Sequence, residues 1–184
     1  IAEELRGDIE VERDYSPYMA VVSANEKYLN NIIYEAEQYI ADRIGVLRDF
    51  SAPEDQEIYL DLIKREETEQ GIQYAELQRK AILSALSRGL LILTGGPGTG
   101  KTTTLNGMIS LFEKQGYQVM LAAPTGRAAQ RISDLTGYEA KTIHRLLEVE
   151  FDMAGATKFR HNESNPLTCD VMIVDEMSMV DVLL

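Results

Sequence analysis

The sequence predicts an α/β protein: a parallel sheet flanked by helices, preceded by a small, mainly helical N-terminal domain. Three observations carry this prediction. Residues 1–72 place apolar side chains at helical spacing, and short apolar runs alternate with helical patterns over residues 73–184. A glycine-rich stretch also separates the first apolar run of the second region from the helix that follows it. We therefore expect a domain boundary near residue 72.

The N-terminal region begins its helices with serine-led capping boxes. "SANE" (23–26) and "SAPE" (51–54) each place a glutamate three residues after a serine. We expect a helix from the first box to about Leu47 and a shorter one from about Glu54 to Glu69. The charged end of the second, "KREETEQG", is interpreted as a solvated linker. These helices are expected to serve packing rather than chemistry.

The second region alternates helices with strands. Because short apolar strands that alternate with helices form βαβ units, we expect a parallel sheet covered on both faces. The expected helices are "ELQRKAILSALSRG" (76–89), "KTTTLNGMISLFEKQG" (101–116), "GRAAQRISDLTG" (126–137) and "KTIHRLLE" (141–148). The expected strands are "LLILT" (90–94), "QVMLAA" (118–123) and "DVMIVDE" (170–176).

Composition limits the classes of partner. The formal net charge of −12 argues against indiscriminate binding to nucleic acid, so any such site has to be a local groove. The single Cys169 forms no internal disulfide, and neither a membrane-length apolar run nor a signal peptide is present. We expect a cytoplasmic protein with no membrane partner. The sequence begins without methionine and ends inside an apolar run, which is typical of a fragment.

The glycine-rich stretch "LTGGPGTGKTTT" predicts a phosphate-binding loop. It satisfies the pattern G-x-x-x-x-G-K-[ST] between an expected strand and an expected helix. Glycines let backbone N–H groups wrap a phosphate chain, and the helix N-terminus adds partial positive charge. Lys101 would face the β- and γ-phosphates and the Thr102 hydroxyl would bind Mg²⁺. The predicted nucleotide-binding residues are Gly95, Gly96, Pro97, Gly98, Thr99, Gly100, Lys101, Thr102 and Thr103.

A pair of carboxylates ends the last expected strand. "VMIVDEMS" delivers Asp175 and Glu176 to the carboxyl end of a buried strand, where open α/β sheets bind their ligands. Asp175 is suited to hold the metal through its water shell, and Glu176 to accept the proton of the attacking water. Together with the phosphate loop, this pair predicts a nucleoside triphosphatase core.

Four segments together resemble the first motor domain of superfamily 1 DNA helicases, in the RecD-like group (the exodeoxyribonuclease V alpha chain family). They are "LTGGPGTGKTTT", "LAAPTGRAAQRISDLTG", "KTIHRLL" and "DVMIVDEMSMVD". The resemblance runs from about Leu77 to the end, and more weakly "KYLNNIIYEAEQYIADRI" is similar to the helical N-terminal domain of those enzymes. It implies a P-loop (RecA-like) fold, ATP and Mg²⁺ as cofactors, and 5′-to-3′ helicase activity in DNA repair or recombination. The implied partners are single-stranded DNA, duplex ends and, in a helicase–nuclease complex, other subunits.

The resemblance also assigns individual residues. Gln78 matches the glutamine that reads the adenine edge, since its amide both donates and accepts. Pro124, Thr125 and Gly126 match one motif that lies against single-stranded DNA, and Thr142 and His144 match another. Whether Arg127 and Arg131 contact DNA phosphates or form surface salt bridges stays open.

Between the last DNA motif and the metal strand, "EVEFDMAGATKFRHNESNPL" alternates in period two around "MAGA", which predicts a β-hairpin at about 149–162. In the RecD-like group such a hairpin serves as the pin that splits the duplex. Here Phe151 and Phe159 would stack on bases or on each other.

The sequence ends just after the metal motif, so the second motor domain of the family is absent and we expect residues 1–184 alone to be inactive or nearly so. Two other functions stay open. One is a P-loop ATPase that does not depend on DNA, in which residues 124–144 contact protein. The other is a docking role for the helical N-terminal region. DNA-stimulated ATP hydrolysis separates the first from a helicase.

Overall fold

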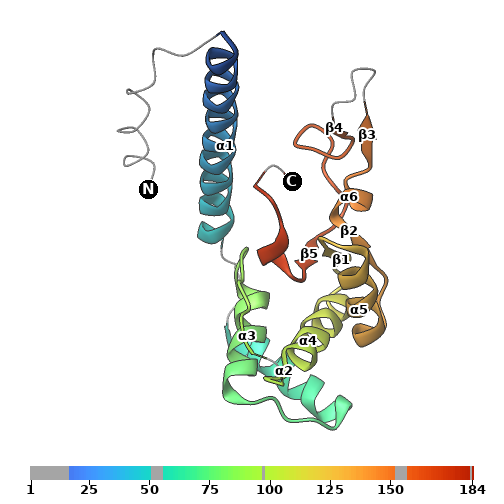
Figure 1. Cartoon of the computed structure of the whole chain (residues 1–184). Helices are drawn as coiled ribbons and strands as arrows, with labels where there is room; N and C mark the ends of the chain where they lie inside the picture. Colours follow the sequence, from blue (N-terminus) through green and yellow to red (C-terminus); the bar gives the residue numbers. More distant parts are fainter. Residues whose placement is uncertain (1–16, 51–55, 97, 152–156, 183) are drawn as a thin grey trace. The chain divides into compact units, whose positions relative to one another are not determined.

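The structure is a computed structural model of the 184-residue chain and describes residues 17–50, 56–96, 98–151, 157–182 and 184. The chain forms two compact units, residues 1–43 with 182–184 and residues 44–181, which we describe separately. Figure 1 gives the element labels used below. No helix among the described residues combines the length and apolarity needed to cross a bilayer.

The first helix, α1 (Pro17–Asp49), begins earlier than predicted. Ser23 of the first capping box lies inside it, so the prediction of a helix start there is wrong. Proline is favoured at the first helical position because its fixed φ suits the helix and its missing N–H needs no partner. Many apolar side chains of its described part are exposed: Tyr34, Tyr39, Ile40, Ile44, Val46 and Leu47. The second capping box, 51–54, lies outside the described residues.

Three helices build the main core of the second unit. They are α2 (Gln56–Gln70), α3 (Glu76–Ser87) and α4 (Lys101–Lys114). Helix α4 lies close to Tyr74 at Gly107, where an added Cβ would sit 2.3 Å from the tyrosine Oη. A glycine at this position therefore permits the approach. The buried residues of this cluster are Tyr59, Ile63, Tyr74, Ile82, Leu86, Met108, Leu111 and Phe112.

The charged end of α2 is not a solvated linker, contrary to the prediction. Glu66 is only 1% exposed, and its Oε2 lies 2.5 Å from Lys114 Nζ on α4. Glu67 accepts from the Arg79 guanidinium of α3 at 2.9 Å, and it also accepts from the backbone N–H of Tyr74. These bonds fasten α2 to both neighbouring helices. A glutamate can be buried when it is paired and hydrogen-bonded in this way.

A three-stranded parallel sheet confirms the predicted fold class (Figure 1). Its strands are β1 (Val119–Ala123), β2 (Ala140–Thr142) and β5 (Val171–Val174), in the order β2-β1-β5. Helix α5 (Gly126–Thr136) connects β1 to β2 and buries Ala128, Ala129 and Ile132. The segment predicted as one helix at 141–148 instead begins in β2 and continues as the short α6 (Ile143–Leu146).

The predicted strand at 90–94 does not form. No described strand pairs with this segment, so its backbone groups have no ladder to join. Leu91 packs against the helical core, whereas Ile92 is 78% exposed. The apolar run predicts burial on both faces, but burial requires strands on either side.

Two short antiparallel strands, β3 (Val149–Phe151) and β4 (Thr157–Phe159), pair in the segment expected to form a hairpin. Val149 lies opposite Phe159. The connection at 152–156 lies outside the described residues. At the base, Arg160 Nη1 donates to Glu148 Oε2 at 2.7 Å. The last described helical turn is the 3₁₀ segment η2 (Met177–Met179).

Candidate functional site

The phosphate loop leads from the unpaired segment 90–94 into α4. Gly98 and Gly100 have φ of +73° and +79°, a backbone conformation that other residues adopt only with strain. A Cβ on Gly95 would lie 2.7 Å from Thr99 Oγ1. The loop's own geometry therefore favours glycine at positions 95, 98 and 100, whereas a Cβ on Gly96 would meet no atom within 4 Å. Pro97 lies outside the described residues.

The functional side chains of the loop are held by its backbone. Lys101 Nζ donates to the carbonyls of Gly95 and Gly96, so the ammonium lies over the loop. Thr102, the second residue of α4, is half-buried, while Thr103 is exposed. The Gly100 carbonyl accepts from the N–H and hydroxyl of Thr104, at 3.0 and 2.9 Å. The loop thus presents a cation and a helix N-terminus together, the chemistry of a phosphate site.

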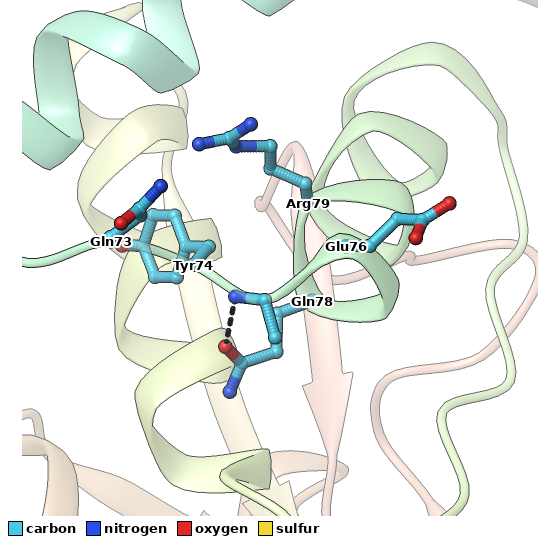
Figure 2. Close-up of a pocket in the computed structure, with 6 residues that line it drawn as sticks. Gln73, Tyr74, Glu76, Gln78 and Arg79 are labelled. Atoms are coloured by element: carbon cyan, nitrogen blue, oxygen red, sulfur yellow. Dashed lines mark hydrogen bonds between the residues drawn. The ribbon is translucent and has the colours of Figure 1, made fainter.

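Gln78 joins the start of α3 to the end of the loop. Its Oε1 accepts from the backbone N–H of Ala75 at 2.8 Å, the bond drawn in Figure 2. Its Nε2 donates to the Gly100 carbonyl at 3.3 Å. Since an amide carries two donor hydrogens and two acceptor lone pairs, one of each remains for a ligand. The bond satisfies the backbone N–H of Ala75, the N-cap residue of α3, whose own side chain caps no N–H of the first turn.

A pocket of about 490 Å³ lies beside Gln78 and is lined by residues 73–76, 78 and 79 (Figure 2). The Arg79 guanidinium at its wall is held by Glu67. Burial, followed by the charges of Glu66 and Glu67, raises the pKa of Tyr74 above its usual value. The pocket therefore offers an uncharged phenol ring and an amide next to the phosphate loop.

The two carboxylates directly follow β5. The Asp175 N–H donates to the Ala122 carbonyl at 3.0 Å, which extends the β1–β5 ladder by one residue. Within the described part of the chain, the half-buried Asp175 carboxylate has no hydrogen bond or ion pair. Glu176 has φ +54° and ψ +35°, a left-handed conformation that costs a non-glycine residue about 1–2 kcal/mol. Strain of this kind is concentrated at functional sites.

The candidate DNA residues lie at the same edge of the sheet as these carboxylates. Ala123, at the end of β1, is in register with Thr142, the last residue of β2, and Ala122 with Val174 of β5. The carboxyl ends of all three strands therefore meet where α/β sheets bind ligands. Pro124, Thr125 and Gly126 follow β1 there.

Both threonines at this edge also cap helices. Thr125 Oγ1 accepts from the Ala128 N–H and Thr142 Oγ1 from the Arg145 N–H, each at 3.2 Å. The hydroxyl hydrogens remain free to donate to a phosphate. His144 is exposed, and its ring lies 6.3 Å from that of Phe159 on β4. One candidate DNA residue therefore contacts the β3–β4 pair.

The structure does not bring all candidates into contact. Among the described residues, no hydrogen bond or ion pair joins the phosphate loop to Asp175 or Glu176. Neither do three His, Cys, Asp or Glu side chains gather there as a ready metal site. The roles of Thr102 and Asp175 as metal ligands therefore stay predictions.

One contact of the site could not be derived from the sequence. Arg131 of α5 lies 3.3 Å from Glu176 Oε1, which favours the salt-bridge interpretation of this arginine. The two residues are 45 positions apart, and only the β1–β5 pairing brings them together. The sequence showed that Arg127 and Arg131 lie one helical turn apart, but this spacing does not identify the partner of Arg131.

Comparisons with known proteins agree with this geometry. The family described as AAA domain matches residues 78–184, from Gln78 through both carboxylates. The ATP-dependent RecD2 DNA helicase of Deinococcus radiodurans is 44% identical over 106 residues, which cover 58% of this chain and 14% of the relative.

Two further relatives are named RecBCD enzyme subunit RecD. The protein of Mycolicibacterium smegmatis is 43% identical over 128 residues, covering 57% of this chain and 23% of the relative. The protein of Haemophilus influenzae is 33% identical over 172 residues, covering 80% of this chain and 26% of the relative. The chain therefore spans about a quarter or less of these relatives. The phosphate loop is that of a nucleotide-binding P-loop domain, and the chain belongs to the AAA domain family, in its RecD-like branch of superfamily 1 helicases.

Proposed function

We propose that the full-length protein carrying this sequence is an ATP-dependent DNA helicase that moves 5′-to-3′ along single-stranded DNA. The observation that carries the proposal is the shared edge of the sheet. There Thr125 follows β1, which pairs with β5, the strand leading to Asp175, and Thr142 ends β2, which pairs with the other side of β1. A site that binds DNA beside its hydrolytic carboxylates can couple the two.

For the nucleotide, each residue has a stated role. The backbone of Gly95–Thr103 and the Lys101 ammonium would hold the phosphates of ATP, and the free donor and acceptor of Gln78 would select adenine. Thr102 and Asp175 would hold Mg²⁺, which neutralises charge on the phosphates. Glu176 would accept the proton of the attacking water. The strained backbone of Glu176 and the free carboxylate of Asp175 support these roles.

For the DNA, the hydroxyls of Thr125 and Thr142 would donate to phosphate oxygens, with Pro124, Gly126 and His144 completing the contact. Because the chain has a net charge of −12, affinity has to come from this narrow region rather than from overall charge. The exposed His144 ring and its contact with Phe159 favour a path for the strand past β3–β4, with the duplex split there.

The nucleotide half is tested with Lys101→Ala in the full-length protein. The lysine is exposed and touches no core residue, so the fold is expected to persist while ATP hydrolysis is almost abolished. Lys80→Ala, another exposed lysine one helix earlier, is the matched control and should leave the rate unchanged. A wild-type rate in Lys101→Ala would show that the loop is not the catalytic site.

The DNA half is tested with Thr125→Ala combined with His144→Ala. We expect weaker binding to single-stranded DNA, measured by fluorescence anisotropy, and unchanged ATP affinity. Thr136→Ala controls for the loss of a helix-bound threonine on α5, since its hydroxyl bonds to the Ile132 carbonyl away from the sheet edge. Unchanged DNA affinity in the double variant, with ATP hydrolysis independent of DNA, would favour a P-loop ATPase of another class.

The relatives' names indicate two settings for such an enzyme: a helicase in its own right and a subunit of the RecBCD enzyme. We expect duplex ends with a single-stranded 5′ tail as substrates in both settings. Purification of the tagged full-length protein from its own cells distinguishes a lone cytoplasmic enzyme from a subunit of a helicase–nuclease complex. Recovery of such a complex through residues 1–72 alone would instead support the docking role of that region.

A further inference from the structure

The contact between Arg131 and Glu176 joins the DNA side of the site to its hydrolytic side. Arg131 lies on α5, the helix that begins directly at the candidate DNA residues Thr125 and Gly126. Glu176 is the proposed general base. Among the described residues, the Arg131 guanidinium is the sole hydrogen-bonding partner of the Glu176 carboxylate, at 3.3 Å.

The backbone on both sides of this contact is fixed. Helix α5 is anchored by the buried side chains of Ala128 and Ile132. The Glu176 carbonyl accepts from the Met179 N–H at 3.0 Å, which closes the 3₁₀ turn and holds the left-handed conformation. The direction of the carboxylate is therefore set by the side-chain contact rather than by movement of either element.

The contact itself is weak and open to competition. The side chains of Arg131 and Glu176 are 67% and 33% exposed, and a single hydrogen bond joins them. An exposed ion pair of this kind changes an equilibrium by at most about fivefold. A DNA phosphate, which binds arginine in a bidentate manner, is a stronger partner for the same guanidinium.

From these observations, and resting on the proposed function, we propose that Arg131 is a positioning residue that couples DNA binding to hydrolysis. In the absence of DNA, the guanidinium holds the Glu176 carboxylate in an ion pair, directed toward α5. When a DNA phosphate binds along α5, it takes over the guanidinium and releases Glu176 to accept the proton of the attacking water. Arg131 thus restrains ATP hydrolysis until DNA is bound.

The test uses the full-length protein and compares ATP turnover with and without oligo(dT). Arg131→Gln removes the restraint, so DNA-free turnover should rise about two- to fivefold while turnover at saturating DNA stays at the wild-type value. Arg131→Lys keeps the charge and should keep DNA-free turnover low. Arg127→Gln removes an exposed arginine one turn earlier on α5 and should also keep the wild-type DNA-free rate.

A second readout follows the phosphate contact. The logarithm of the oligo(dT) association constant falls linearly with the logarithm of the salt concentration. The slope of this line should become shallower by about 0.7 in Arg131→Gln, because one phosphate contact is lost. A merely structural role for Arg131 would change neither this slope nor the ratio of the two turnover rates. Circular dichroism is expected to show the same fold, because the substituted side chain is exposed.

The possible results separate the inference from the proposed function. If wild-type turnover is stimulated by DNA but Arg131→Gln leaves DNA-free turnover unchanged or lowers it, the coupling role is wrong and the helicase proposal stands. If the wild-type protein shows no DNA-stimulated turnover, both are wrong. A raised DNA-free rate in Arg127→Gln as well would also overturn the specific role of Arg131.

Discussion

Replacing Lys114 with methionine should destabilise the second compact unit, because it leaves a buried carboxylate without its cation. Glu66 is 1% exposed, and Lys114 Nζ lies 2.5 Å from its Oε2. The only other hydrogen bond to this carboxylate among the described residues comes from Gln70 Nε2, at 3.3 Å from Oε1. Methionine keeps the aliphatic stem of the lysine, so the substitution removes the charge with little loss of packing.

The size of the effect follows from this asymmetry of burial. Removing one partner of a fully buried ion pair costs about 3–5 kcal/mol. The Lys114 side chain is 43% exposed, so water reaches the vacated side, and the bond from Gln70 remains. We therefore expect the free energy of unfolding to fall by about 2 kcal/mol, equivalent to a fall of about 6 °C in the thermal midpoint.

Urea unfolding followed by circular dichroism measures this change. Lys64→Met is the matched control, since Lys64 pairs with Asp61 at 3.5 Å where both side chains are about 70% exposed, and it should cost less than about 0.5 kcal/mol. Adding Glu66→Gln to Lys114→Met removes the isolated charge and should recover at least half of the loss. A loss below about 0.5 kcal/mol in Lys114→Met, or no recovery in the double variant, would refute the reasoning.

Three other predictions follow from the same structure. Gly107→Ala should lower the free energy of unfolding by about 1–2 kcal/mol in urea, because the added Cβ would meet Tyr74 Oη at 2.3 Å, although alanine has the better helix propensity. Gly45→Ala on α1, where an added Cβ meets no atom within 4 Å, should leave the protein at least as stable. The free energy of unfolding should fall above about pH 10, because hydrogen bonds to Glu66 and Glu69 raise the pKa of Lys114 and burial raises the pKa of Tyr74, so the unfolded chain releases both protons more readily. Lys114→Met should lessen that fall, and a free energy of unfolding that stays constant above about pH 10 would contradict both raised pKa values. Residues 1–184 expressed alone should hydrolyse ATP at least about 10³-fold more slowly than the full-length protein. Within the described residues Lys101 is the only cationic side chain bonded to the phosphate loop, and rapid phosphoryl transfer needs a second cation on the γ-phosphate. Turnover near the full-length rate would contradict this prediction.

Local patterns predicted the elements whose stability is local. Helix α4 ends at Lys114, just before Gly116 with φ +84°, and α5 ends before Gly137 with φ +78°, as the glycine stop signals indicate. The sheet strands β1 and β5 were predicted from apolar runs with turn residues on both sides. The order of the strands and the brief strand β2 were not, because a three-residue strand in a polar segment exists only through its pairing with β1.

The candidate site was predictable in its residue types but not in its contacts. The phosphate-loop pattern fixed both the positive-φ glycines and the lysine. By contrast, the bond from Gln78 to Gly100 and the pair of Arg131 with Glu176 span 22 and 45 positions. Such pairs depend on how the helices pack on one another and on the sheet, which no local pattern encodes. The burial of Glu66 was missed for the same reason, since its partner lies 48 positions away.

The unpaired segment at 90–94 has the sequence of a buried strand but no described strand to pair with. Four consecutive apolar residues favour a strand covered on both faces, yet Ile92 and Leu93 are 78% and 38% exposed because no described strand lies beside them. The phosphate loop connects this segment, at its N-terminal end, to α4, at its C-terminal end. The α4 side is fixed by the buried Met108, Leu111 and Phe112, whereas in 90–94 Leu91 packs against the same core while Ile92 and Leu93 are exposed. Pairing of 90–94 with a strand would hold the second side, and with it the position of the loop relative to Asp175. The affinity for nucleotide should therefore depend on strand pairing at 90–94 as well as on the residues of the loop.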